Sequence, residues 1–261
     1  MTMLRVGFLG DGHISGVLRR TVEETRPYRV AGTFGRDGVL PGPAEIDVIV
    51  EAATQQAVRE RVPGLLAAGT DVILLSVGAL AEPALRAELL HRPSPGRGRL
   101  IVCTGAIGGL DQVRALRAAG PLRTVSIESR KLPATLLQPW MPEELQAALR
   151  DGGTEIVLAD GPAGEVAQRF PASANVAAAL ALAADAWGFA TARIVADPAA
   201  DPTRHEVHAA GDLGEVRAVV ENAPSSERPR SSAVVAWAAL RALDDYARLR
   251  GFPTVSGAAF L

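Results

Sequence analysis

The stretch Leu4-Arg-Val-Gly-Phe-Leu-Gly10-Asp-Gly12-His-Ile-Ser15 runs from an apolar segment into a glycine-rich turn near the N-terminus. Apolar residues then recur at helical spacing over residues 14–24, so the sequence predicts a strand, a turn and a helix in succession. Gly10 permits the tight turn, Gly12 lets the backbone approach a pyrophosphate, and the helix N-terminus offers N–H groups to the phosphates. Ser15 replaces the third glycine of the usual pattern and is small enough to keep the helix close to the strand. The segment is therefore predicted to bind a dinucleotide.

The end of the second predicted strand, residues 28–34, bears on which dinucleotide is used. An Asp or Glu about twenty residues after the glycine turn commonly binds the ribose hydroxyls of NAD. This chain reads Phe34-Gly35-Arg36-Asp37 there, with no acid at the strand tip and an arginine beside it. We therefore expect NADP to be used, with Arg36 accommodating the adenosine 2′-phosphate, and NAD as the other candidate cofactor. The alternative is that Arg36 is a solvated loop residue and Asp37 binds the ribose.

Composition limits the class of protein. The chain has 261 residues, 48% of them hydrophobic, which is enough for a sizeable core in two closely packed domains. The net charge of −2 and the lack of a basic run argue against a nucleic-acid or membrane-surface partner. No apolar stretch reaches the roughly eighteen residues of a membrane span, and the N-terminus has no signal-peptide pattern, so we expect a cytoplasmic protein. The single cysteine, Cys103, lies in an apolar run and is expected to be a buried structural thiol.

The order of strand-like and helical segments predicts an α/β fold. Up to about residue 111, short apolar strands alternate with helices, which is typical of a parallel sheet covered on both faces. Thereafter strand-like segments with polar alternation follow one another, at residues 124–130, 154–159, 192–196, 206–209 and 215–220. This second pattern favours a mixed or antiparallel sheet with helices on one face.

Two domains follow from this change of pattern. We assign residues 1–111 with 232–261 to a Rossmann-type dinucleotide-binding domain, and residues 112–231 to an α+β domain for catalysis and oligomerisation. The second segment of the first domain contains a long predicted helix, which a serine at 231 or 232 is expected to cap.

Two segments of the chain are candidates for cofactor contacts beyond the glycine turn. The loop Cys103-Thr-Gly-Ala106-Ile-Gly-Gly109 follows the last strand of the first half. Ligands of open parallel sheets bind beyond the carboxyl ends of the strands, so this loop is expected to flank the nicotinamide. Asn175 precedes an alanine-rich helical segment and, taken alone, is better explained as the N-cap of that helix.

A histidine and a lysine are candidates for chemistry on the substrate. Strand periodicity places His205 on the same face as Val207 and Ala209, and it directs His208 to the other face. A histidine on the packed face is the better general acid–base candidate because its ordinary pKa lies near neutrality. A structural role for such a histidine is the alternative. Lys131 ends a predicted strand and is a candidate for binding a substrate carboxylate, with a solvated lysine as the alternative.

Over nearly its whole length the sequence resembles the L-aspartate dehydrogenase family. The matching stretches are Val50–Thr54, Leu75–Leu80, Thr104–Asp111, Arg130–Pro133, Phe170–Ala178, Asp197–Pro198, His205–Val207 and Glu221–Pro224. The resemblance implies a two-domain fold, a homodimer or higher homo-oligomer, a catalytic histidine at His205, and cofactor contacts at Ala106 and Asn175. Together with the glycine turn, it places the cofactor contacts at Gly10, Gly12, His13, Ile14, Arg36, Ala53, Ala106 and Asn175.

Departures from the family pattern bear on substrate and cofactor preference. Thr203 stands where the family usually has Asn, two positions before the catalytic histidine, and Thr104 replaces a serine. Arg130, Lys131 and Thr203 are the candidate substrate-binding residues, and no metal ligands are singled out.

The resemblance implies oxidation of L-aspartate to iminoaspartate, which water converts to oxaloacetate and ammonia, together with the reverse reaction. One alternative is a related dehydrogenase acting on another small amino or oxo acid. The other is a dinucleotide-binding sensor without catalysis.

Overall fold

The computed structural model describes residues 2–90, 95–225, 232–255 and 257–258. The chain folds as two compact units. The first consists of Met1–Gly105 with Val235–Leu261, and the second of Ala106–Val234. The sequence places the corresponding boundaries at residues 111 and 232. Within the described ranges, no helix combines the length and the apolar character that are needed to cross a membrane.

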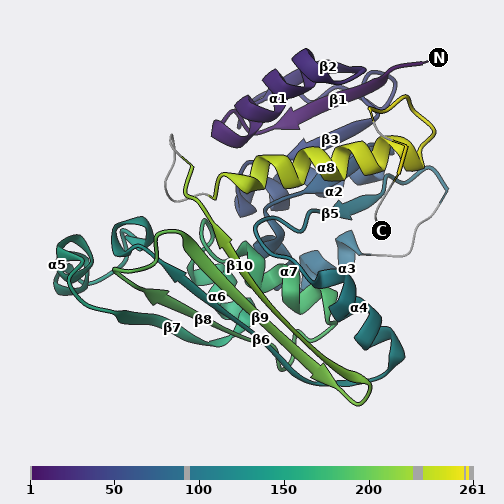
Figure 1. The fold of residues 1–261 in the computed structure, drawn as a ribbon. Coiled ribbons are helices and arrows are strands. Elements are labelled where there is room, and N and C mark those ends of the chain that lie inside the picture. Colours follow the sequence, from purple (N-terminus) through teal and green to yellow (C-terminus); the bar gives the residue numbers. More distant parts are fainter. Residues whose placement is uncertain (1, 91–94, 226–231, 256, 259–261) are drawn as a thin grey trace. The chain divides into compact units, whose positions relative to one another are not determined.

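The first unit is built on a parallel sheet of five strands in the order β2-β1-β3-β4-β5. The strands are β1 (Leu4–Leu9), β2 (Tyr28–Phe34), β3 (Val48–Glu51), β4 (Asp71–Leu74) and β5 (Leu100–Val102) (Figure 1). This confirms the expected Rossmann-type sheet. β3 and β4 are shorter than the strands that the sequence predicts at residues 47–53 and 71–77. The chain turns after Glu51 and forms a short 3₁₀ helix, η1 (Val77–Ala81), soon after β4.

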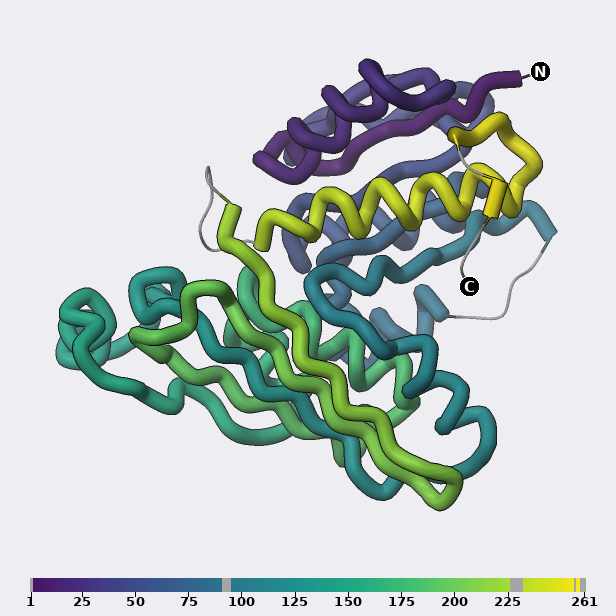
Figure 2. The backbone as a smooth tube through the Cα atoms, viewed as in Figure 1, coloured from purple at the N-terminus to yellow at the C-terminus, as the bar shows by residue number. Residues whose placement is uncertain are grey.

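Four helices belong to this sheet: α1 (His13–Thr25), α2 (Gln55–Ala68), α3 (Pro83–Leu89) and α8 (Val234–Leu249). α1 and α8 share one hydrophobic core with the sheet, in which Leu240 and Leu243 of α8 pack with Phe8 of β1. Figure 2 shows the yellow C-terminal helix beside strands from the purple and blue start of the chain. The last helix therefore returns to the first unit, as expected. Ser231, one of its two predicted caps, lies outside the described residues.

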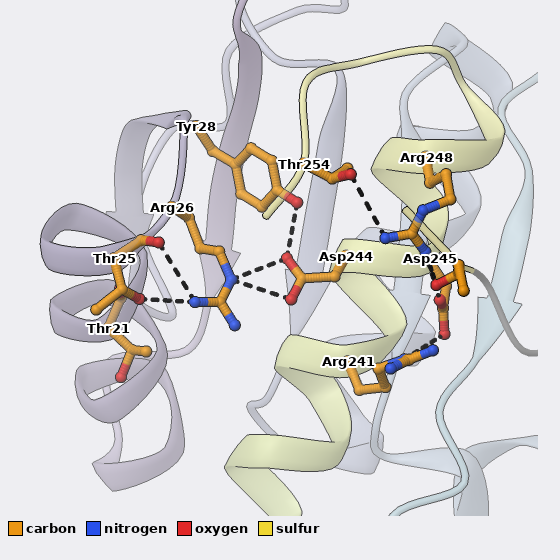
Figure 3. Close-up of polar contacts among 10 residues, drawn as sticks. Thr21, Thr25, Arg26, Tyr28, Arg241, Asp244, Asp245, Arg248 and Thr254 are labelled. Atoms are coloured by element: carbon orange, nitrogen blue, oxygen red, sulfur yellow. Dashed lines mark hydrogen bonds and ion pairs between the residues drawn. The ribbon is translucent and has the colours of Figure 1, made fainter. Parts of the chain in front are cut away.

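A buried carboxylate fixes α8 in place. Asp244 is 7% exposed and accepts hydrogen bonds from the Tyr28 hydroxyl at 2.7 Å and from Arg26 Nε at 3.0 Å (Figure 3). Both partners lie at the junction of α1 and β2, more than 200 positions earlier in the chain. Two residues further on, the hydroxyl of Tyr246 donates to Asp71 Oδ2 at 2.9 Å, at the start of β4. These polar contacts set the position of α8 along the sheet, which apolar packing alone does not specify.

The second unit contains a mixed sheet in the order β10-β9-β6-β8-β7. Its strands are β6 (Leu122–Lys131), β7 (Ile156–Pro162), β8 (Thr191–Ala196), β9 (Thr203–Gly211) and β10 (Gly214–Asn222). Only β6 and β8 run parallel among the neighbouring pairs of these strands. The helices are α4 (Leu110–Ala119), α5 (Glu143–Asp151), α6 (Ala163–Arg169) and α7 (Asn175–Ala183), with a 3₁₀ turn η2 (Pro133–Leu136). α4, α6 and α7 pack on the sheet, as the expected α+β architecture requires.

Two helical segments differ from the sequence expectation. α4 was not predicted, because only Leu110 and Val113 of this helix are buried, too few for a clear period. α7 ends at Ala183 although the apolar pattern continues to residue 187. Asp185 adopts a positive φ of 48°, which no α-helix can include.

Replacing Asp244 tests the link that fixes α8. Asp244→Ala leaves the Arg26 guanidinium and the Tyr28 hydroxyl without their partner in a largely buried position. We expect the free energy of unfolding to fall by about 2–3 kcal/mol. Denaturant unfolding monitored by circular dichroism measures the change.

Asp245 provides the matched control, because its ion-pair partners Arg241 and Arg248 lie on the same helix. Asp245→Ala should cost less than about 1 kcal/mol. An equal loss of stability in the two variants would show that Asp244 has no special role in holding α8.

Candidate active site

His205 lies near the start of β9 in the second sheet, directly opposite Ser129 on the neighbouring strand β6. Its side chain is 1% exposed, and the Ser129 hydroxyl lies 2.8 Å from Nδ1 of the imidazole. Val207 and Ala209 are buried on the same face, whereas His208 is only half-buried on the opposite one. The predicted orientation of both histidines is confirmed. Ser129 was not a candidate from the sequence, since a serine in an alternating strand carries no signal until its cross-strand neighbour is known.

The imidazole of His205 is neutral, and one of its two nitrogens makes no hydrogen bond within the described residues. Burial, assisted by the positive charge of Lys131, lowers the pKa of His205 to about 3. Nε2 is buried and has no hydrogen-bond partner within the described residues. Buried polar atoms are nearly always paired in native proteins, so an unpaired one requires an explanation. A bound substrate would supply the missing partner.

Lys131 is buried on the same face of the sheet. It follows Ser129 by two positions on β6, is 7% exposed, and has its pKa lowered to about 8 by burial. The alternative of a solvated lysine is therefore wrong. Thr203, 8% exposed, precedes His205 by two positions and shares its face. The structure thus brings Lys131, Thr203 and His205 to one buried face, together with Ser129.

Arg130 points to the other face of the sheet. Its guanidinium forms ion pairs with Glu128 at 2.6 Å, Glu155 at 2.6 Å and Asp197 at 2.9 Å. The side chain alternates with Ser129 and Lys131, which are buried on the opposite face. The structure therefore does not bring this candidate residue together with His205.

The loop after β5 is fastened to β10. Ala106 is buried, and its carbonyl oxygen accepts a hydrogen bond from Asn222 Nδ2 at 2.8 Å. Asn222 pairs with Thr203 across β9 and β10, so one asparagine connects the loop to the strand of His205. In the sequence, the only sign that Asn222 has a role was its position in the stretch Glu221–Pro224, which resembles the family described above. Asn175 is the first residue of α7 and not its N-cap, which is Ala174.

The glycine turn has the geometry of a phosphate cradle. Gly10 has φ of 106°, and a Cβ there would lie 2.8 Å from the Ala52 oxygen and 2.9 Å from Ala53 Cα. Only glycine is compatible with this combination. Gly12 is the N-cap of α1 with no side-chain hydrogen bond, and a Cβ there would meet nothing within 4 Å. The helix N-terminus therefore has room for a dinucleotide pyrophosphate, and the residues present fit that group.

The remaining cofactor candidates lie around this turn. His13 and Ile14 are the first two residues of α1 and are half-buried, whereas Arg36 is exposed just beyond β2. Ala53 lies in the loop after β3, against Gly10.

A carboxylate that was not predicted holds the loops after β3 and β4. Glu51 is fully buried and accepts hydrogen bonds from the backbone N–H groups of Ala53 and Ser76, both at 2.9 Å. The Ser76 hydroxyl donates to the same carboxylate at 2.8 Å. The sequence did offer a sign of this role, because Glu51 is an acid within the apolar run Val48–Ala53. Cys103, by contrast, is the expected structural thiol: it is buried, and burial raises its pKa to about 11.

Comparison with known proteins gives a consistent assignment for both units. Residues 111–246 match the family model described as aspartate dehydrogenase, C-terminal, and residues 7–102 match that of the homoserine dehydrogenase NAD-binding domain. The crystal structure of an aspartate dehydrogenase from Thermotoga maritima superimposes with a TM-score of 0.69 at 23% identity. It covers 98% of this chain and 100% of its own, which establishes a shared fold.

Relatives of higher sequence identity carry the same description. An L-aspartate dehydrogenase from Methanothermobacter thermautotrophicus is 35% identical, over 93% of this chain and 96% of its own. L-aspartate dehydrogenase 2 from Bordetella pertussis is 40% identical, over 81% of this chain and 78% of its own. The matched family model covers the strands that carry His205, Ser129 and Lys131. The chain therefore belongs to the L-aspartate dehydrogenase family.

Proposed function

We propose that the protein is an NAD(P)-dependent L-aspartate dehydrogenase. The reaction removes a hydride from C2 of L-aspartate and a proton from its amino group, giving iminoaspartate, which water converts to oxaloacetate and ammonia. In reverse, oxaloacetate and ammonia are reductively aminated. The bound nicotinamide dinucleotide supplies the hydride acceptor, and the protein supplies position and electrostatics. The observation that carries the proposal is the unpaired, buried Nε2 of His205 on the face that also holds Lys131.

His205 acts as the acid–base group or orients the attacking water. Ser129 occupies Nδ1, so proton exchange with the substrate takes place at Nε2. Without a bound anion the imidazole is a weak base, since burial and Lys131 lower the pKa of His205. A dicarboxylate bound nearby has the opposite effect, because a negative charge stabilises the imidazolium. The imidazole thus becomes more basic when the substrate is present.

Lys131 is the proposed anchor for a substrate carboxylate. A buried ammonium is costly unless an anion pairs with it, and an aspartate carboxylate meets that need. Thr203 is proposed to contribute a hydroxyl to the same pocket. Because this threonine departs from the family pattern, the second candidate function is a related dehydrogenase for another small amino or oxo acid. A substrate panel separates the two.

Three further features of the proposal come from the sequence. We propose a homodimer or higher homo-oligomer, a cytoplasmic location, and cofactor contacts at the glycine turn, Ala53, Ala106 and Asn175. A dinucleotide sensor without catalysis is the alternative of another class, and it predicts binding without turnover on any oxo acid.

Replacing His205 tests the assignment of the acid–base group. His205→Asn should lower kcat by roughly a hundredfold or more, because proton transfer at Nε2 is lost. The measurement is oxidation of NADH or NADPH in the presence of oxaloacetate and ammonium, followed by absorbance. Ser129→Ala should lower kcat less, since it leaves the imidazole in place without its Nδ1 partner. His208→Asn, on the other face of the same strand, serves as the matched control and should keep full activity. If His205→Asn were as active as His208→Asn, His205 would have no part in the chemistry.

The pKa of Lys131 predicts how the affinity for a dicarboxylate depends on pH. Below about pH 8 the ammonium is charged and attracts a carboxylate, and above it the charge is lost. The inhibition constant of succinate, which has no amino group of its own to titrate, should therefore rise as pH increases through 8. In Lys131→Met, succinate should bind roughly tenfold more weakly or worse at pH 7 and lose this pH dependence. Arg130→Met tests the other cation in the same assay. If only Arg130→Met changed the inhibition constant of succinate, Arg130 and not Lys131 would bind the substrate carboxylate.

A further inference from the structure

The tip of β2 lacks the acid that usually binds the adenosine ribose. Gly35 follows the last residue of the strand, Phe34, and has no side chain to offer. A site for NAD commonly has a hydrogen-bond acceptor at that place, because the ribose presents hydroxyl groups there, whereas a site for NADP has an arginine beside the 2′-phosphate. The position is either left without an acceptor or filled from elsewhere in the fold.

The carboxylate of Asp11 lies at this position. A Cβ placed on Gly35 would be 3.4 Å from Asp11 Oδ2 and 3.8 Å from Asp11 Cγ, which is ordinary van der Waals contact. The carboxylate is therefore next to the space that an acidic side chain of residue 35 would enter. The backbone brings the two segments together, since the N–H of Gly10 donates to the Phe34 carbonyl at 2.8 Å.

The loop that faces Asp11 is itself held in place. The N–H of Gly38 donates to the Gly35 carbonyl at 3.2 Å, closing a tight turn. The guanidinium of Arg61, on α2, donates to the carbonyls of Arg36 and Gly38. No ion pair joins Asp11 to Arg36 within the described ranges, and both side chains are exposed. The carboxylate of Asp11 is therefore not neutralised by the neighbouring arginine and is available to a ligand.

We propose that Asp11, from the glycine turn, binds the hydroxyls of the adenosine ribose in place of the missing acid of β2. The consequence is a preference for NAD over NADP, because the carboxylate accepts hydrogen bonds from the 2′-hydroxyl and repels a 2′-phosphate. This reverses the expectation of NADP that follows from Arg36 alone. The inference rests on the proposed function only in that a nicotinamide dinucleotide binds to the first unit.

Calorimetric titration of the full chain with NADH and NADPH tests this role apart from catalysis. The unmodified protein should bind NADH at least tenfold more tightly than NADPH. In Asp11→Asn the dissociation constant for NADH should rise by roughly tenfold, while binding of NADPH should stay equal or tighten. Asp37→Asn is the control, since Asp37 is the other acid near the strand tip, and it should leave the NADH to NADPH ratio unchanged.

A second variant restores the acid from its usual place. Gly35 does not have a left-handed backbone conformation, so it tolerates a side chain. Asp11→Asn combined with Gly35→Asp should recover the preference for NADH. The proposal is overturned if the unmodified protein binds NADPH as tightly as NADH, or if Asp37→Asn and not Asp11→Asn changes the ratio. Failure of aspartate turnover with this preference intact would refute the proposed reaction and leave the role of Asp11 standing.

Discussion

The burial of the C-terminal helix against the parallel sheet is the constraint on which the rest of the chain depends. β1, β3 and β4 present apolar side chains on that face, and a parallel sheet is stable only when both faces are covered. The helix that covers this face is α8, at residues 234–249, which follows the whole second unit in the sequence. In the sequence, the second unit is consequently an insertion between β5 and α8 of the first unit. Asp244 fixes where α8 lies along the sheet, because its partners Arg26 and Tyr28 are at the end of α1 and the start of β2.

The proposed chemistry of the second unit rests on two basic groups that lie on one buried face. Lys131 and His205 both have a lowered pKa, from burial and, for the histidine, from the lysine charge. Two positive charges so close together would repel each other, and an anion bound between them would offset the repulsion. Perturbed titratable groups of this sort are typical of functional sites. These two basic groups are the physical basis for proposing that a dicarboxylate binds at this face.

Single polar side chains hold the loops around the carboxyl ends of the strands. Glu51 binds the N–H groups of Ala53 and Ser76, and Asn222 binds the carbonyl of Ala106. Each is buried, so each replaces water as the partner of backbone groups that would otherwise lack one. Loops fixed in this way present backbone atoms to a ligand with little loss of conformational entropy on binding. Asp11 differs from both, since it is exposed and no partner in the described structure uses its carboxylate.

The sequence by itself determined the division into two domains, the parallel and mixed sheets, the glycine turn and the buried face of His205. These features follow from local periodicity and from short motifs, which depend only on residues close together in the sequence. The helix at 110–119 and the end of α7 were missed, because a few apolar residues or one positive φ decide them. Only the tertiary structure decided that Ser129 meets His205, that Lys131 is buried while Arg130 is not, and that Asp11 faces Gly35. Strand register and the packing of distant segments set these contacts, and the residues concerned are up to 76 positions apart in the chain.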